Sequence, residues 1–175
     1  MLFRSSNIAA EFVAHSKPDG YTLLFNPASV TLSAALGEKL GYDLLRDLAP
    51  VGLVAAGPQL FILHPGVPVR TVPEFIAELR AHPDKLSYGS AGGTTLSHLA
   101  VLLFLQANGL RALHVPYKGA APANMDVVAG RIQFSLADVG SALPLVNEKR
   151  VRPLAITSLK RLPLLPDVRS EGAHV

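Results

Sequence analysis

The sequence has 175 residues, of which 49% are hydrophobic and 17% are charged. These proportions exclude a disordered chain and allow one domain, or two small lobes that share a core. Aromatic residues make up only 6%, tryptophan is absent, and the net charge of +3 is spread along the chain. The composition therefore disfavours nucleic acid as a partner. Cysteine is absent as well, which excludes disulfides, thiolate nucleophiles and cysteine-based metal sites.

The first part of the chain is expected to form short elements joined by tight turns. Asn7 is a typical N-cap residue ahead of apolar residues at helical spacing. Residues 18–20 (Pro-Asp-Gly) signal a turn, because Pro fixes φ, Asp bonds to the turn backbone and Gly tolerates positive φ. The elements expected here are helices over residues 7–16 and 33–39 and strands over residues 21–26, 49–56 and 60–64.

The rest of the chain alternates between strand and helix patterns. Thr71 precedes a helical pattern, and Glu74 stands three residues later, at the spacing of a capping box. Alternating strands and helices are typical of βαβ units, so we expect an α/β fold with a mostly parallel sheet. The expected helices cover residues 72–81, 95–108, 121–129 and 141–148, and the strands cover residues 85–89, 113–117, 132–136 and 153–157.

The segment that says most about function is a loop rich in Gly, Ser and Thr within residues 88–99. It joins an expected strand to the N-terminus of an expected helix. Small residues let a ligand approach the backbone, and the N–H groups of a helix N-terminus attract an anion. One interpretation is a cradle for a carboxylate or phosphate, and the other is an ordinary glycine-rich turn with a Thr N-cap. The glycine spacing does not match a nucleotide-binding loop.

Two further loops follow expected parallel strands and should lie at the same edge of the sheet. Tyr117 and Lys118 could line a cleft there, or Tyr117 could pack while Lys118 is solvated. Asp138 could meet a polar group of a ligand, or it could cap the helix that follows.

Ser97 and His98 invite comparison with a hydrolase, but neighbouring residues on a helix point in different directions. The sequence also lacks the Gly-x-Ser-x-Gly pattern of a nucleophile elbow. The six histidines lack the spacing of four residues that places two imidazoles on one metal ion. We therefore expect no enzyme activity, no metal and no cofactor.

Seven short motifs occur in an order that resembles the tripartite tricarboxylate transporter substrate-binding proteins, the Bug-type extracytoplasmic solute receptors. Each motif is weak, whereas the ordered set is highly specific, and the resemblance covers residues 7–168. The motifs are residues 18–24 (Pro-Asp-Gly-Tyr-Thr-Leu-Leu), 88–92 (Tyr-Gly-Ser-Ala-Gly), 97–100 (Ser-His-Leu-Ala), 114–119 (His-Val-Pro-Tyr-Lys-Gly), 141–144 (Ser-Ala-Leu-Pro), 154–158 (Leu-Ala-Ile-Thr-Ser) and 165–168 (Leu-Pro-Asp-Val).

The resemblance implies a type II periplasmic-binding-protein fold with two α/β lobes, of which the first is incomplete. The first lobe would comprise residues 7–67 plus 155–175, and the second would comprise residues 68–154. Such a receptor binds a small carboxylate-bearing ligand in the periplasm and works with membrane transporter subunits. The chain carries no signal peptide, so we expect a cytoplasmic location if it is expressed as written.

The resemblance also implies which residues hold the ligand, through backbone amides and hydroxyls of the Gly-Ser-Ala-Gly loop and the neighbouring loops. Two of these positions depart from the family pattern, since Thr94 stands where Gly is usual and Ala137 stands where Asp is common. The expected ligand-binding residues are Ser29, Ser90, Ala91, Gly92, Thr94, Thr95, Tyr117, Ala137 and Asp138.

The chain further lacks the first strand and the Pro-Gly-Gly loop of the family, and it stops soon after residues 165–168. We therefore expect a receptor truncated at both ends, with self-association through the incomplete first lobe. The alternatives are a structural or interaction fragment that has lost ligand binding and, less favoured, a small Ser/His hydrolase.

Overall fold

The computed structural model describes residues 4–170. No helix among these residues has both the length and the apolar character needed to cross a membrane. The helices are α1 (Arg4–Ala14), α2 (Ala28–Ala35), α3 (Val72–Ala81), α4 (Leu96–Ala107), α5 (Ala120–Val128) and α6 (Val139–Asn147). The strands are β1 (Gln59–Leu63), β2 (Ser87–Ser90), β3 (Leu113–Pro116), β4 (Phe134–Asp138), β5 (Arg152–Ile156) and β6 (Arg169–Ser170).

The chain divides into two compact units, and the division differs from the expected lobe boundary. The first unit contains residues 4–56 and Thr94–Leu96, and the second contains residues 57–93 and 97–170. Residues 57–67 fall in the second unit because β1 pairs with β4 on one side and with β5 on the other. β5 and β6 belong to the same sheet, so residues 155–170 also group with the second unit.

The first unit is small and consists of α1, α2 and the loops that follow them. Its core is formed by Ala10, Val30 and Tyr42. Asn7 links these parts, since its amide nitrogen donates to Ser33 Oγ at 3.2 Å and its Oδ1 accepts from the Tyr42 hydroxyl at 3.4 Å. Asn7 therefore lies within α1 rather than capping it.

The strands expected over residues 21–26 and 49–56 are wrong, because both segments lack regular secondary structure. Tyr21 and Leu53 are 92% and 87% exposed, although strand residues of this kind are normally half-buried. A strand exists only when a neighbouring segment supplies hydrogen bonds, and among residues 4–170 no segment pairs with either one. The helix expected over residues 33–39 lies earlier, as α2.

The second unit is built on a six-stranded sheet with the order β3-β2-β4-β1-β5-β6. The α/β class is confirmed, and the sheet is mixed. β2 is parallel to both β3 and β4, and β5 is parallel to β6. β1 is antiparallel to both of its neighbours. The register between β1 and β5 shifts beside Pro153, a residue that cannot donate to the ladder.

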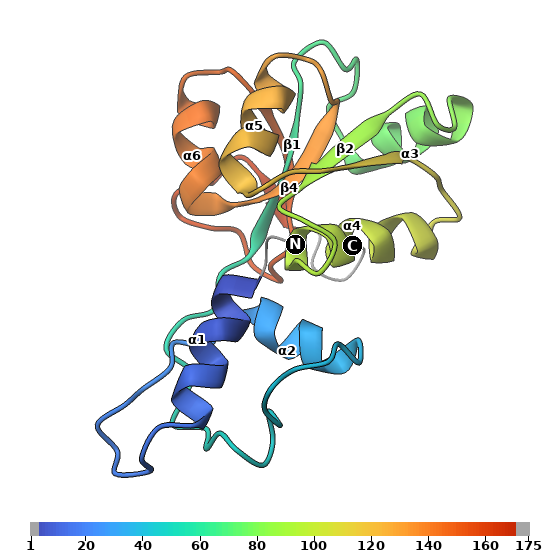
Figure 1. The fold of residues 1–175 in the computed structure, drawn as a ribbon. Coiled ribbons are helices and arrows are strands. Elements are labelled where there is room, and N and C mark those ends of the chain that lie inside the picture. The colour runs from blue at the N-terminus through green and yellow to red at the C-terminus, as the bar shows by residue number, and fades with distance from the viewer. Residues whose placement is uncertain (1–3, 171–175) are drawn as a thin grey trace. The chain divides into compact units, whose positions relative to one another are not determined.

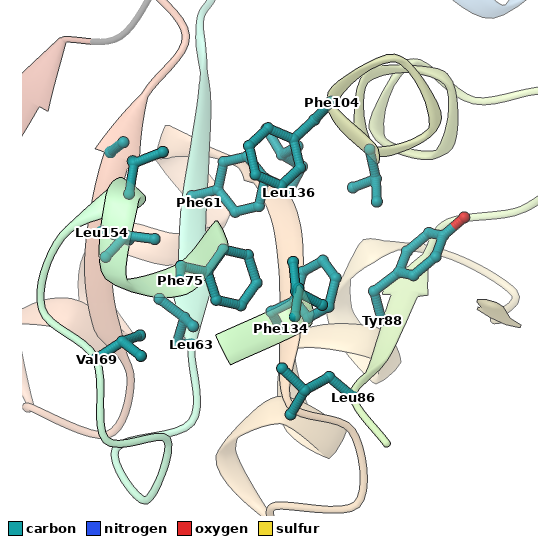
Figure 2. Close-up of a cluster of buried hydrophobic side chains, with 14 of the residues drawn as sticks. Phe61, Leu63, Val69, Phe75, Leu86, Tyr88, Phe104, Phe134, Leu136 and Leu154 are labelled. Atoms are coloured by element: carbon teal, nitrogen blue, oxygen red, sulfur yellow. The ribbon is translucent and has the colours of Figure 1, made fainter. Parts of the chain in front are cut away.

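Helices cover both faces of this sheet (Figure 1), so β1 is buried along its whole length. Phe61 and Leu63 face one side, where they pack with residues of α3 and α4, including Phe75 and Phe104. The rings of Phe61 and Phe104 meet edge to face with their centroids 5.2 Å apart. Figure 2 shows this cluster, with Tyr88 at its border and the Tyr88 hydroxyl pointing away from it. The other face packs against α5 and α6.

α3 begins and ends where its local sequence predicts. Thr71 is the N-cap residue, and its side chain accepts a hydrogen bond from the Glu74 N–H. The Glu74 carboxylate returns a contact by accepting from the Arg70 N–H at 2.7 Å. The local pattern of residues 71–81 was therefore sufficient to place this helix.

Candidate functional site

The carboxyl ends of three neighbouring parallel strands lie at one edge of the second unit. β2 lies between β3 and β4, and Ser90 at its end pairs in register with Pro116 at the end of β3. The Tyr117 N–H donates to the Ser90 carbonyl at 2.9 Å, which extends the ladder by one residue. The loops that follow β2, β3 and β4 therefore start side by side, as the βαβ pattern predicts.

The loop after β2 is organised around the hydroxyl of Ser90, which is 2% exposed. The Gly92 N–H donates to Ser90 Oγ at 3.1 Å, and Ser90 Oγ lies within 3.1 Å of the Gly92 carbonyl oxygen. Ser90 Oγ also lies 2.7 Å from His114 Nε2. Gly92 has φ of 133°, in the region that favours glycine. The Ala91 N–H makes a longer contact of 3.5 Å with Ser97 Oγ.

Three aromatic side chains stack behind this loop. The rings of His98 and His114 are nearly parallel with centroids 3.9 Å apart, and the Tyr88 ring lies 4.9 Å from His114. The Tyr88 hydroxyl lies 3.2 Å from His98 Nδ1. Burial raises the pKa of Tyr88 to about 12. Burial, together with the neighbouring His98, lowers the pKa of His114 to about 4, and burial also lowers the pKa of His98.

The three stacked rings line a surface pocket of about 570 Å³ in the second unit. Leu102 and Leu105 of α4, Leu110 before β3 and Leu113 in β3 form half of the remaining wall. Asp84 and Arg111 stand at this pocket and form an ion pair of 3.6 Å. The pocket therefore gives solvent a route to the imidazole rings.

Tyr117 makes contacts that support a packing role. Its hydroxyl donates to Asp126 Oδ2 at 2.7 Å, and Asp126 also pairs with Arg131 at 2.8 Å. Burial and the bond to Asp126 raise the pKa of Tyr117 to about 12. The bonds from Tyr117 and Arg131 lower the pKa of Asp126. Lys118 is exposed, which agrees with the solvated alternative.

Asp138 is the N-cap residue of α6, but its side chain does not cap the helix. Its Oδ1 instead accepts from the Gln59 side-chain amide at 2.6 Å, across the pair of strands β1 and β4. Of the two alternatives for Asp138, the one in which its side chain caps the helix is therefore wrong. Ala137 packs with the core residues on the α5 and α6 face and is 2% exposed, so only its backbone could reach a ligand.

The remaining predicted residues lie elsewhere. Ser29 is on α2 in the first unit, and Thr94 and Thr95 belong to the same unit. Thr95 immediately precedes α4 and is 8% exposed. A common site that includes Ser29 stays a prediction. Among residues 4–170, no three His, Cys, Asp or Glu side chains are grouped so that they could hold a metal ion.

Two residues at this edge, Gln59 and His114, were not among the candidate site residues expected from the sequence. Gln59 starts β1, and its backbone also joins β5 through the Thr157 hydroxyl at 2.9 Å. Its pairing with Asp138 depends on an antiparallel register that the alternating pattern did not predict. His114 stands two residues before Pro116, and its partner Ser90 follows only from the register of β2 and β3.

Known proteins resemble this chain over nearly its whole length. The family model described as the tripartite tricarboxylate transporter family receptor matches residues 5–173. A UPF0065 protein from the tcbD–tcbE intergenic region of Pseudomonas sp. strain P51 is 36% identical over 161 residues, which cover 92% of this chain and 48% of that protein. Protein BugT of Bordetella pertussis is 29% identical over 92% of this chain and 50% of its own length.

Solved structures have the same fold. An R. palustris protein solved with adipate matches with a TM-score of 0.84 and 32% identity, over 96% of this chain and 56% of its own chain. The periplasmic binding protein BugD matches with a TM-score of 0.83 and 30% identity, over 96% of this chain and 57% of its own. MatC of Rhodopseudomonas palustris, solved with bound malate, has a TM-score of 0.81 and 29% identity, with 96% and 57% covered.

The chain spans about half the length of the curated relatives that it matches. The ordered motifs, the α/β fold and the family match over residues 5–173 agree with one another. The family is described as one of receptors, in agreement with the expectation that the chain is not an enzyme. The chain belongs to the tripartite tricarboxylate transporter receptor family.

Proposed function

We propose that this chain carries part of the ligand-binding site of a solute receptor for a small carboxylate. The loop from Ser90 to Thr95, at the end of β2 and ahead of α4, is the part that contacts the acid group. The receptor works in the periplasm and delivers its ligand to membrane subunits of a tripartite transporter. These statements extend the family membership to the activity, location and partners of the protein.

One observation supports this proposal more than any other. Two similar structures that each cover 96% of this chain were solved with dicarboxylates, namely adipate and malate. The loop after β2 has features suited to such a ligand, because Gly93 is exposed, Ala91 is half-buried and α4 begins directly after the loop. The positive end of a helix stabilises an anion placed at its N-terminus.

The hydrogen bonds of the loop support a particular way of binding the acid group. Gly92 N–H and Ser90 Oγ already bond to each other, so they shape the loop. The Ala91 N–H contacts Ser97 Oγ only at 3.5 Å, so a carboxylate oxygen can replace that contact at small cost. The acid group is therefore expected to contact Ala91 and the residues that lead into α4.

Calorimetric titration of the chain with adipate and with malate tests the proposal. We expect saturable binding of at least one, and we expect Gly92→Val to weaken it at least about tenfold, because a β-branched residue at φ of 133° distorts the loop. His98→Ala should matter less, since the His98 ring contacts Tyr88 and His114 and reaches the loop only through them. Failure of the parent chain to bind either acid, or equal affinity of Gly92→Val and the parent, contradicts the proposal.

A hydrolase is not favoured by the contacts of its candidate groups. His98 Nδ1 lies against the Tyr88 hydroxyl. Ser90 does lie beside an imidazole, that of His114, but Ser90 as a whole is 2% exposed and its hydroxyl is engaged with Gly92. A serine nucleophile must reach the carbonyl carbon of a substrate, and Ser90 is enclosed by its own loop.

A further inference from the structure

Three polar atoms surround the hydroxyl of the buried residue Ser90, and the hydroxyl has one proton to share among them. It lies 3.1 Å from the Gly92 nitrogen, 3.1 Å from the Gly92 carbonyl oxygen and 2.7 Å from His114 Nε2. A serine hydroxyl has one proton to donate and two lone pairs to accept with. Only one arrangement uses all three contacts as hydrogen bonds.

In that arrangement the Ser90 hydroxyl donates to the Gly92 carbonyl oxygen and accepts from two N–H groups. One acceptor position takes the Gly92 N–H, and the other takes a proton carried by His114 Nε2. In the alternative, Ser90 donates to an unprotonated Nε2, and no proton then lies between the Ser90 and Gly92 oxygens, which are 3.1 Å apart. The lone pairs of two oxygens at this distance repel each other, so the Nε2–H form of His114, which turns all three contacts into hydrogen bonds, is favoured.

The ring of His114 is fixed in the orientation that this bond requires. Its face packs on His98 at a centroid distance of 3.9 Å and on Tyr88 at 4.9 Å. His98 is in turn held by the Tyr88 hydroxyl, 3.2 Å from its Nδ1. The His114 backbone pairs with Tyr88 in the parallel ladder of β2 and β3. Backbone register and ring stacking thus place Nε2 against Ser90.

We propose that His114 is a positioning residue of the carboxylate site, which acts by donating from Nε2 to Ser90 Oγ and thereby holds the loop of Ser90 and Gly92 in its binding conformation. The effect on ligand affinity rests on the proposed function, whereas the effect on the loop does not. His114 touches the loop and not the ligand. His114 acts on the loop through its Nε2–H group, in addition to the packing of its ring.

The protonation state of the ring can be measured directly in the full chain without any ligand. Nitrogen-15 NMR of the imidazoles at pH 7 distinguishes a ring protonated at Nε2 from one protonated at Nδ1. We expect the Nε2–H form for His114, assigned by loss of its signals in His114→Phe. A ring protonated at Nδ1 overturns the proposal.

Hydrogen exchange of the Gly92 amide tests the action on the loop, with three variants. His114→Phe keeps a stacking ring but removes the N–H group, Ser90→Ala removes the shared hydroxyl, and His114→Gln restores an N–H donor. We expect exchange at Gly92 to accelerate at least about tenfold in the first two variants and to return to within about threefold of the parent in His114→Gln. His15→Phe, the same change at an exposed position of the first unit, should leave Gly92 unchanged.

Equal exchange at Gly92 in the parent and in His114→Phe overturns the proposal, as does a His114→Gln variant that exchanges as fast as His114→Phe. Titration with adipate adds a separate result. If the parent binds, His114→Phe should weaken affinity at least about tenfold and His114→Gln by less than about threefold. If the parent does not bind, the proposed function fails, while the tautomer and the exchange rates still decide the role of His114.

Discussion

Ser90 and the stacked rings beside it show how a few side chains fix a glycine-containing loop. The hydroxyl of Ser90 bonds to the Gly92 N–H in place of solvent, and the same hydroxyl lies beside His114 Nε2. The imidazole pair is kept neutral at pH 7, because burial lowers the pKa of both rings and each charged ring would repel the other. Protonation of His98 or His114 is therefore expected to destabilise the stacked imidazole pair.

Stability should fall when the solution is acidified through the range in which these histidines titrate. An unfolded histidine has a pKa near 6.5, and the pKa of folded His114 is about 4. Between these values the unfolded chain binds more protons than the folded chain, so acid favours unfolding. The stability that the neutral His114 ring contributes is complete above about pH 6.5 and is lost as the pH falls through about 4.

Urea unfolding at a series of pH values from 7 to 4 measures this dependence. The groups that face His114 are the imidazole of His98 and the hydroxyl of Tyr88, and Asp84 and Arg111 stand in the same pocket. We expect His114→Phe to have a shallower dependence than the parent between about pH 6.5 and 4. Identical slopes in the two proteins would show that His114 does not titrate as described.

At the scale of the elements, β2 packs closely against its neighbours at Gly89. Gly89 stands in the middle of this strand, between β3 and β4 and beneath α5. A Cβ at this position would lie 2.5 Å from Ile132 Cδ1, 3.1 Å from Ala123 Cβ and 3.2 Å from Tyr117 Cε2. The absence of a side chain therefore lets α5 lie directly on the strand that carries the site.

Gly89→Ala should lower the free energy of unfolding by about 1–3 kcal/mol, because a methyl group has no space there. Gly140→Ala is a matched control, since a Cβ on Gly140 in α6 meets nothing within 4 Å and alanine favours helix. We expect this control to be neutral or slightly stabilising in the same urea titration. A Gly89→Ala protein as stable as the parent would mean that α5 does not pack on β2 in this way.

An element could be predicted from the sequence when the contacts that stabilise it are local, and not when they come from distant parts of the chain. α3 could be predicted, because Thr71 and Glu74 form its cap within one turn. The same holds approximately for α4 and for the strands β2, β3 and β5. The antiparallel direction of β1 could not be predicted, since it depends on pairing with β4 and β5, which lie far along the chain.

The candidate site was predictable to a similar extent. Glycine at position 92 and the change from strand to helix allowed an anion-binding loop as one of two interpretations without knowledge of the fold. The side chains that fix its surroundings were not predictable, because Ser90 and His114 are 24 residues apart and Gln59 and Asp138 are 79 apart. Local sequence contains no signal for contacts of this kind.

At the scale of the whole molecule, two extended segments of the first unit, residues 21–26 and 49–56, expose several large apolar side chains. Tyr21, Leu23 and Phe25 are exposed in one extended segment, and Val51, Leu53 and Val54 are exposed in another. Large exposed apolar patches are unusual in monomers and promote association.

We therefore predict that the chain associates with a second copy of itself through residues 21–26 and 49–56. Light scattering over a concentration series should show a mass that rises above 18.5 kDa. Replacement of Leu23 and Leu53 by Asp should restore the monomer, whereas Leu159→Asp, at an equally exposed position in the second unit, should not. A monomeric mass at every concentration would contradict this prediction.

Amide NMR of the chain titrated with adipate tests most directly whether the loop at the end of β2 binds a carboxylate. We expect the largest saturable shifts at the backbone amides of residues 90–95, with Ala91 among them, and smaller shifts at the start of α4. Shifts centred elsewhere, for example at Gln106 and Arg111 in the pocket beside the stacked rings, or no saturable shifts at all, would contradict binding at this loop.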